Sequence, residues 1–207
     1  MPTYFSIDFQ YRRADLCKTT VNDFFKNLTD CGLVYKSGFW HSKNDGLNDI
    51  LIWNQKKLED NFELGYTEHY SHDYKQMLFD FRDFSEVRLV MQNIPEKGSF
   101  TFCLIIPEDD FIEYNDTGKY KRLEHKMQIV EDFACHMWEV GDMSCIQSFW
   151  ECSGCYDISD IIKGDEPSFE PFAIVPANTY RTKWNCSCEM IGRDGVILKN
   201  DNNWFYG

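Results

Sequence analysis

The chain has 207 residues, of which 43% are hydrophobic and 16% aromatic, so it can bury a sizeable core and lacks the composition of a disordered protein. Its 34 acidic and 21 basic side chains give a formal net charge of −13, which disfavours binding to nucleic acid and to anionic membranes, since both attract clusters of Lys and Arg. If this charge is functional, the partner is a basic protein.

No stretch has the pattern of a leader or a membrane span. Arg12 and Arg13 follow an alternating segment and do not precede an apolar run, so we predict no signal peptide. The longest apolar stretches, such as residues 103–106, are far shorter than the ~20 residues that cross a bilayer. With no export signal and an odd number of cysteines, nine, we expect reduced thiols and a cytoplasmic protein.

Apolar spacing predicts the first elements. Residues 4–9 alternate between apolar and polar side chains, the pattern of a half-buried strand. Residues 21–28 place apolar side chains at intervals of three, four and seven behind two threonines, which predicts a helix that ends at Gly32. Residues 47–62 also approach helical spacing, although the short run 50–53 would suit a buried strand; we predict a helix here.

The middle of the chain has strand patterns followed by the clearest helix. Residues 77–81, 87–91 and 100–106 are rich in apolar and β-branched side chains and predict an antiparallel meander. Residues 123–138 present one apolar face and one charged face, as an amphipathic helix does, and Gly141 is the expected end.

The last third predicts a strand at 146–151, an irregular stretch at 153–171, a strand at 172–175 and a hairpin whose turn is 192–195. Strands therefore outnumber helices and occur in runs. This pattern predicts an α+β fold, a mostly antiparallel sheet with about three helices packed mainly on one face. With no repeat or linker, we expect a single globular domain over residues 1–207.

An acidic segment lies between the predicted meander and the amphipathic helix. Its carboxylates are Glu108, Asp109, Asp110, Glu113 and Asp116. Such spacing can bind Ca²⁺, but the residue order of an EF-hand loop is absent. We expect a solvated turn that is well placed to meet a basic partner.

A second candidate combines two imidazoles, two carboxylates and two phenols in seven residues ahead of the meander. Its residues are Glu68, His69, Tyr70, His72, Asp73 and Tyr74. Imidazole transfers protons near neutral pH, and imidazole with carboxylate is also a metal ligand set. A polar loop between two elements explains the same composition, and we favour that interpretation.

Two closely spaced cysteine pairs can supply the four thiolate ligands of a tetrahedral zinc site. They are Cys152 with Cys155 and Cys186 with Cys188. The alternation of residues 184–190 instead predicts that the second pair faces inward from a strand, so we expect no cofactor.

The common nucleotide, esterase and zincin motifs are missing, which lowers the expectation of a familiar enzyme. We expect a non-catalytic acidic binding module that docks on a basic protein through the acidic segment, with Tyr70 and Tyr74 as aromatic anchors. One version is an inhibitor of the immunity type that occupies the positive groove of a nuclease toxin. The alternatives are an unfamiliar enzyme that uses His69, His72 and Asp73, and a structural zinc domain.

Overall fold

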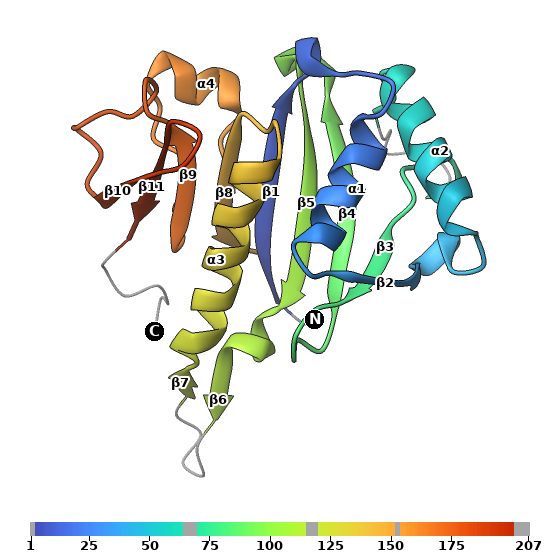
Figure 1. Cartoon of the computed structure of the whole chain (residues 1–207), viewed down its shortest axis with the longest axis horizontal. Helices are drawn as coiled ribbons and strands as arrows, with labels where there is room; N and C mark the ends of the chain where they lie inside the picture. The colour runs from blue at the N-terminus through green and yellow to red at the C-terminus, as the bar shows by residue number, and fades with distance from the viewer. Residues whose placement is uncertain (1–2, 64–69, 115–119, 152–153, 201–207) are drawn as a thin grey trace.

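The computed structural model describes residues 3–63, 70–114, 120–151 and 154–200. Nine strands form one antiparallel sheet in the order β10-β11-β9-β8-β1-β5-β4-β3-β2 (Figure 1). The described chain has four α-helices, fewer than its strands, so the predicted α+β fold is confirmed.

The strands of the large sheet differ in length, and the longest lie at its centre. They are β1 (Tyr4–Arg12), β2 (Val34–Gly38), β3 (Met77–Asp80), β4 (Val87–Ile94), β5 (Ser99–Pro107), β8 (Cys145–Trp150), β9 (Phe172–Pro176), β10 (Ser187–Ile191) and β11 (Gly195–Lys199). A separate two-stranded sheet pairs β6 (Ile112–Tyr114) with β7 (Tyr120–Arg122). The helices are α1 (Thr20–Asp30), α2 (Leu47–Glu59), α3 (Glu124–Val140) and α4 (Ile158–Lys163).

Strand β1 defines the two ends of the sheet. It pairs antiparallel with both β5 and β8, so that Tyr4 lies opposite Pro107 at one end and Arg12 lies opposite Ser99 at the other. The eight steps from Tyr4 to Arg12, at about 3.4 Å each, separate these ends by roughly 27 Å. Groups at the two ends of β1 are therefore distinct surfaces.

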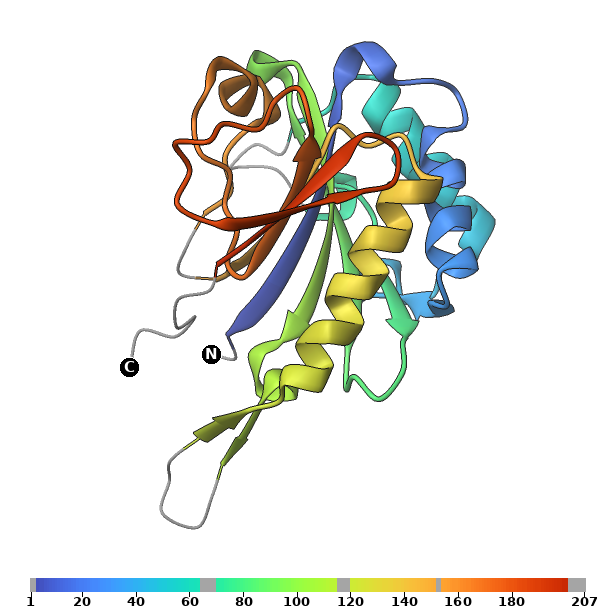
Figure 2. The same ribbon diagram turned by 60° about the vertical axis from the view of Figure 1, so that its left-hand side comes forward.

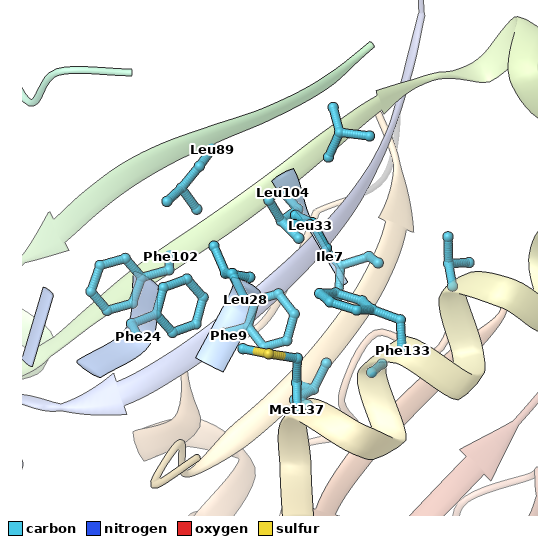
Figure 3. Packing of buried hydrophobic residues seen from close by; sticks show 14 of the residues in the cluster. Ile7, Phe9, Phe24, Leu28, Leu33, Leu89, Phe102, Leu104, Phe133 and Met137 are labelled. Atoms are coloured by element: carbon cyan, nitrogen blue, oxygen red, sulfur yellow. The ribbon is translucent and has the colours of Figure 1, made fainter. Parts of the chain in front are cut away.

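Helices α1, α2 and α3 cover one face of the sheet and enclose the main core (Figure 1). Side chains from α1 and α3 meet those of β1 and β5 there (Figure 3). Phe24 stacks on Phe102 with ring centroids 4.0 Å apart, and Phe9 meets Phe133 edge to face at 6.1 Å. Burying each such side chain contributes about 1.5–3 kcal/mol to folding.

The fourth helix covers the opposite face. Because neighbouring residues in a strand point to opposite sides, Ile146 faces the main core while Cys145 joins a second apolar cluster with Ile158 and Ile161 of α4. The irregular stretch predicted at 153–171 thus contains a helix. Its six residues are too few to show a helical period, which is why the apolar pattern did not indicate it.

Two edge strands differ from expectation. Strand β2 was not predicted, because it is an edge strand with little apolar alternation, and Val34 in it is 62% exposed. Strand β10 was expected to bury Cys188, but this thiol is exposed and Met190 is 64% exposed. That inward-facing assignment was wrong, because β10 is an edge strand.

The remaining predicted elements are confirmed: the first strand, the three long helices, the antiparallel meander and the final hairpin. The first strand is, however, buried on both faces and not half-buried, because it lies at the centre of the sheet. Among the described residues, no helix is both long enough and apolar enough to cross a membrane.

Candidate functional site

The acidic segment begins directly after β5. Its first residues form a 3-10 turn, η5 (Glu108–Phe111), and not an open loop. Asp109 is exposed, whereas the carboxylate of Asp110 accepts 2.9 Å hydrogen bonds from both the backbone N–H and the hydroxyl of Ser85. Asp110 thus holds the β3–β4 connection, which leaves Glu108 and Asp109 as the carboxylates of this turn that can meet a partner.

Strands β6 and β7 form a hairpin, here called the arm, that extends away from the body of the molecule (Figures 1 and 2). Glu113 lies opposite Lys121, so the described part of the arm is mixed in charge. Tyr114 is 61% exposed and lies opposite Tyr120. Asp116, the last predicted carboxylate, lies outside the described residues. The arm therefore offers an exposed aromatic side chain beside the acidic turn.

The base of the arm is anchored in the main core. Phe111 is 3% exposed and packs edge to face against Phe5 and Trp150, at 4.9 and 5.7 Å between ring centroids. The backbone carbonyl of Phe111 also accepts a 3.0 Å hydrogen bond from the N–H of Leu123, just before α3. This base holds the arm in a defined direction.

The predicted histidine and tyrosine segment is described only in part. Glu68 and His69 lie outside the described residues, as does the side chain of Tyr70. His72 closes the 3-10 turn η3 (Tyr70–His72) and is exposed. Because His69 is outside the part of the chain that the structure describes, the predicted pairing of the two imidazoles stays a prediction.

Asp73 and Tyr74 have structural partners. Burial raises the pKa of the Asp73 carboxyl, and the backbone N–H of Tyr74 donates a 2.7 Å hydrogen bond to that carboxyl. Tyr74 is 7% exposed and its hydroxyl donates to the carbonyl of Phe62 at 3.0 Å. Tyr74 is thus a core residue and not the exposed anchor that we expected.

Asp73 also lines a pocket of about 280 Å³ that includes His41 and Ser42, two residues the sequence analysis did not assign to a site. His72 is not part of the pocket wall. An imidazole and a carboxyl in one cavity can transfer protons, but Lys75 and Asp45 in the same wall pair with each other at 2.9 Å. The hydroxyl of Ser42 lies within hydrogen-bond distance of the backbone carbonyls of Phe39 and Gln76, at 2.8 and 2.7 Å, and is thus engaged with the backbone.

The three cysteines of these pairs that the structure describes do not lie in a common site. Cys155 donates to the carboxylate of Asp8 on β1 at 2.9 Å. Cys188 belongs to β10, four places along the sheet from β1, and Cys186 packs against the second apolar cluster. Cys152 lies outside the described residues, and the described residues contain no group of three or more potential metal ligands.

A buried polar row lies on the back of β1, the face opposite the three long helices. Asp8 is 3% exposed and Gln10 is 2% exposed. Gln10 and Gln147 both donate to the carbonyl of Tyr156, at 2.9 and 2.6 Å, and so hold the segment that leads into α4. Burial raises the pKa of Asp8, opposed by hydrogen bonds from cysteine thiols. This row has a structural role.

The structure also assembles a pocket that the sequence analysis missed. Three arginines line it, and they lie far apart in the sequence: Arg12, Arg181 and Arg193. No local motif connects these residues, so only the topology of the sheet reveals the group. We call this cavity the arginine pocket.

Comparison of the chain with protein-family models, with curated proteins and with solved structures gives no match.

Proposed function

We propose that the protein is a non-catalytic binding module that docks on a basic protein through the arm and the acidic turn η5. The observation that carries the proposal is the arm itself. It leaves the sheet at an acidic turn, extends from the body and presents Tyr114 at 61% exposure (Figure 2). An isolated two-stranded hairpin is marginally stable in water, so its anchored base points to a use outside the core.

The two parts of this surface have different physical roles. Tyrosine supplies a large contact area at low conformational cost and is enriched at the centres of interfaces. Carboxylates at the rim, here Glu108 and Asp109, accelerate the encounter with a positive surface and favour it over other partners. The net charge of −13 also attracts a positively charged partner, and it does so at longer range than these two carboxylates.

A positive groove is the surface that this chemistry fits best. Enzymes that cleave nucleic acid carry such a groove to bind phosphates, so an inhibitor of the immunity type is the specific version that we propose. Whether or not this partner is a nuclease, the proposal requires that it is a basic protein.

Catalysis at the pocket of His41 and Asp73 is the weaker alternative. The pocket does not include His72, and Lys75 and Asp45 in its wall are already paired. The described side chains of the arm, by contrast, do not belong to the main core, which only Phe111 of η5 joins at the base of the arm. Docking therefore gives the arm a function, whereas catalysis at the pocket of His41 and Asp73 does not use the arm.

The test uses matched charge variants in a capture experiment. Wild-type protein, the double variant Glu108→Gln/Asp109→Asn and the single variant Tyr114→Ala are immobilised and exposed to native cell extract. The control is Glu96→Gln/Asp165→Asn, which removes two exposed carboxylates at other positions in the chain. Retained proteins are identified by mass spectrometry, purified and measured for association rate at low and high salt.

We expect a basic protein that wild type and control retain equally. The η5 variant should associate severalfold more slowly at low salt, and the difference should shrink at high salt because ions screen exposed charges. Tyr114→Ala should mainly raise the dissociation rate. A partner that all four proteins bind alike would overturn the assignment of the arm and η5 as the docking surface.

A further inference from the structure

The arginine pocket lies at the Arg12 end of β1, away from the arm. It is formed where β1 and β9 end and β8 begins, and α4 closes one side. Its volume is about 730 Å³, the size of a small-molecule site. Chain segments that are distant in sequence meet there, because in an antiparallel sheet each strand begins at the edge where its neighbours end.

Charge in the pocket is opposite in sign to that of the whole chain. Three of the seven arginines of the sequence line it, together with the carboxylates of Asp15 and Asp142. Asp15 is paired with Arg12 at 2.8 Å. Within the described chain, neither Arg181 nor Arg193 makes an ion pair with a carboxylate. Two guanidinium charges therefore lack a direct counter-ion.

Both of these guanidinium groups are held in place by neutral acceptors. Arg181 donates to the carbonyls of Asn178 and Tyr180, at 3.0 and 3.1 Å. Arg193 donates to the carbonyls of Trp138 and Met143. Backbone carbonyls orient a guanidinium without cancelling its charge, and each group has five N–H donors, so donors remain for a ligand.

In the hairpin turn 192–195, Arg193 occupies a central position at which a long side chain is uncommon. Arg193 and Asp194 have φ angles of 54° and 50°, in the left-handed region that favours glycine and asparagine. The guanidinium of Arg193 lies over the ring of Trp138, 4.1 Å from its centroid. Backbone strain of this kind gathers at binding sites, where surrounding contacts hold the residue in position. Here those contacts fix the direction of a cationic side chain.

The rest of the wall sets the ligand class. Ser144 and Thr179 contribute hydroxyl groups, and Ile158, Ile162 and Met143 form an apolar side. Three arginines and two carboxylates leave the wall with one net positive charge, which favours an anion. Guanidinium forks bind phosphate oxygens in pairs, and neither Arg181 nor Arg193 spends its fork on a carboxylate. We propose that the arginine pocket binds a small phosphate monoester, with the phosphate between Arg181 and Arg193 and the organic part against α4.

The test is a titration of the full chain, followed by NMR, with three probes: inorganic phosphate, phenyl phosphate and uncharged phenol. We expect saturable shifts at the amides of Ser144 and Thr179, with phenyl phosphate binding more tightly than phosphate because its ring reaches the apolar side. Phenol alone should bind weakly or not at all. Since this site does not involve the arm, the result is independent of the proposed docking function.

Variants test the role of each charge. Arg181→Gln should weaken phenyl phosphate binding by at least about tenfold, as expected for the loss of a charge-assisted hydrogen bond. Asp142→Asn should strengthen binding, because it removes a negative charge from the same wall. Arg82→Gln, an exposed arginine elsewhere, is the control for general charge and should leave binding unchanged.

Two results would overturn the proposal. One is the absence of saturable shifts at millimolar phenyl phosphate. The other is equal weakening in Arg181→Gln and Arg82→Gln, which would mean that phosphate responds only to the net charge of the protein.

Discussion

At the Tyr4 end of β1 the chain forms an acidic turn and an arm that extends outward, whereas at the Arg12 end it forms a hollow lined by arginines. The two surfaces differ in shape as well as in sign. The arm is convex and presents an exposed aromatic side chain, which suits a protein surface; the pocket is concave and suits a small molecule. The net charge of −13 is a sum over the whole chain, so it does not reveal the different charges of the two ends.

The largest expected effect concerns the base of the arm. Phe111→Ala removes a side chain that is 3% exposed and should lower the free energy of unfolding by about 3–5 kcal/mol. Tyr114→Ala, three residues further on, removes an exposed ring and should change stability by about 0.5 kcal/mol or less. Urea denaturation measures both, and equally small losses would show that the arm is not anchored in the core.

A smaller loss is expected at the pocket end from Gly195→Ala. A Cβ added at Gly195 would overlap the indole nitrogen of Trp138, which donates to the carbonyl of Gly192 in the same turn. We expect a loss of about 1–3 kcal/mol, together with weaker phenyl phosphate binding. Gly154→Ala, whose added Cβ meets nothing within 4 Å, is the control. If the midpoint of urea unfolding were the same for Gly195→Ala and wild type, the proposed packing would be contradicted.

The smallest effect concerns Asp8, between the two ends. Burial raises the pKa of its carboxyl, so the folded chain holds this proton more tightly than the unfolded chain does. This contribution to stability is present below the unfolded pKa of about 4 and is lost as pH rises toward the folded pKa. Asp8→Asn removes the titration but keeps an oxygen that can accept from Cys155.

Asp8→Asn should therefore be more stable than wild type by about 1 kcal/mol at pH 7, and this gain should shrink near pH 4. Urea denaturation at the two pH values measures the difference. A gain that is the same at both pH values would show that Asp8 does not titrate as its burial predicts.

The sequence predicted most of the fold because its long elements carry strong apolar periods. The pattern over residues 123–138 and the alternation over 4–9 are both set by burial against the same core. It missed α4 and β2, the first because six residues show no period and the second because an exposed edge strand needs little apolar pattern.

The candidate sites were harder to predict from the sequence than the fold. The carboxylates of Glu108 and Asp109 are visible as a run of acidic residues, but the arm is not, because a short hairpin outside the core has no burial pattern. The arginine pocket depends on Arg12, Arg181 and Arg193, which only the pairing of distant strands brings together. A group of residues that are distant in the sequence can be found only when the topology of the sheet is known.

The central claim is that the acidic end docks on a protein partner while the opposite end does not. Hydrogen–deuterium exchange of the purified complex with the captured basic partner tests it most directly. We predict slower exchange on complex formation in residues 108–114 and 120–122, and unchanged exchange in residues 176–181 and 192–195. Protection confined to the pocket end, or no protection at the arm, would contradict the account.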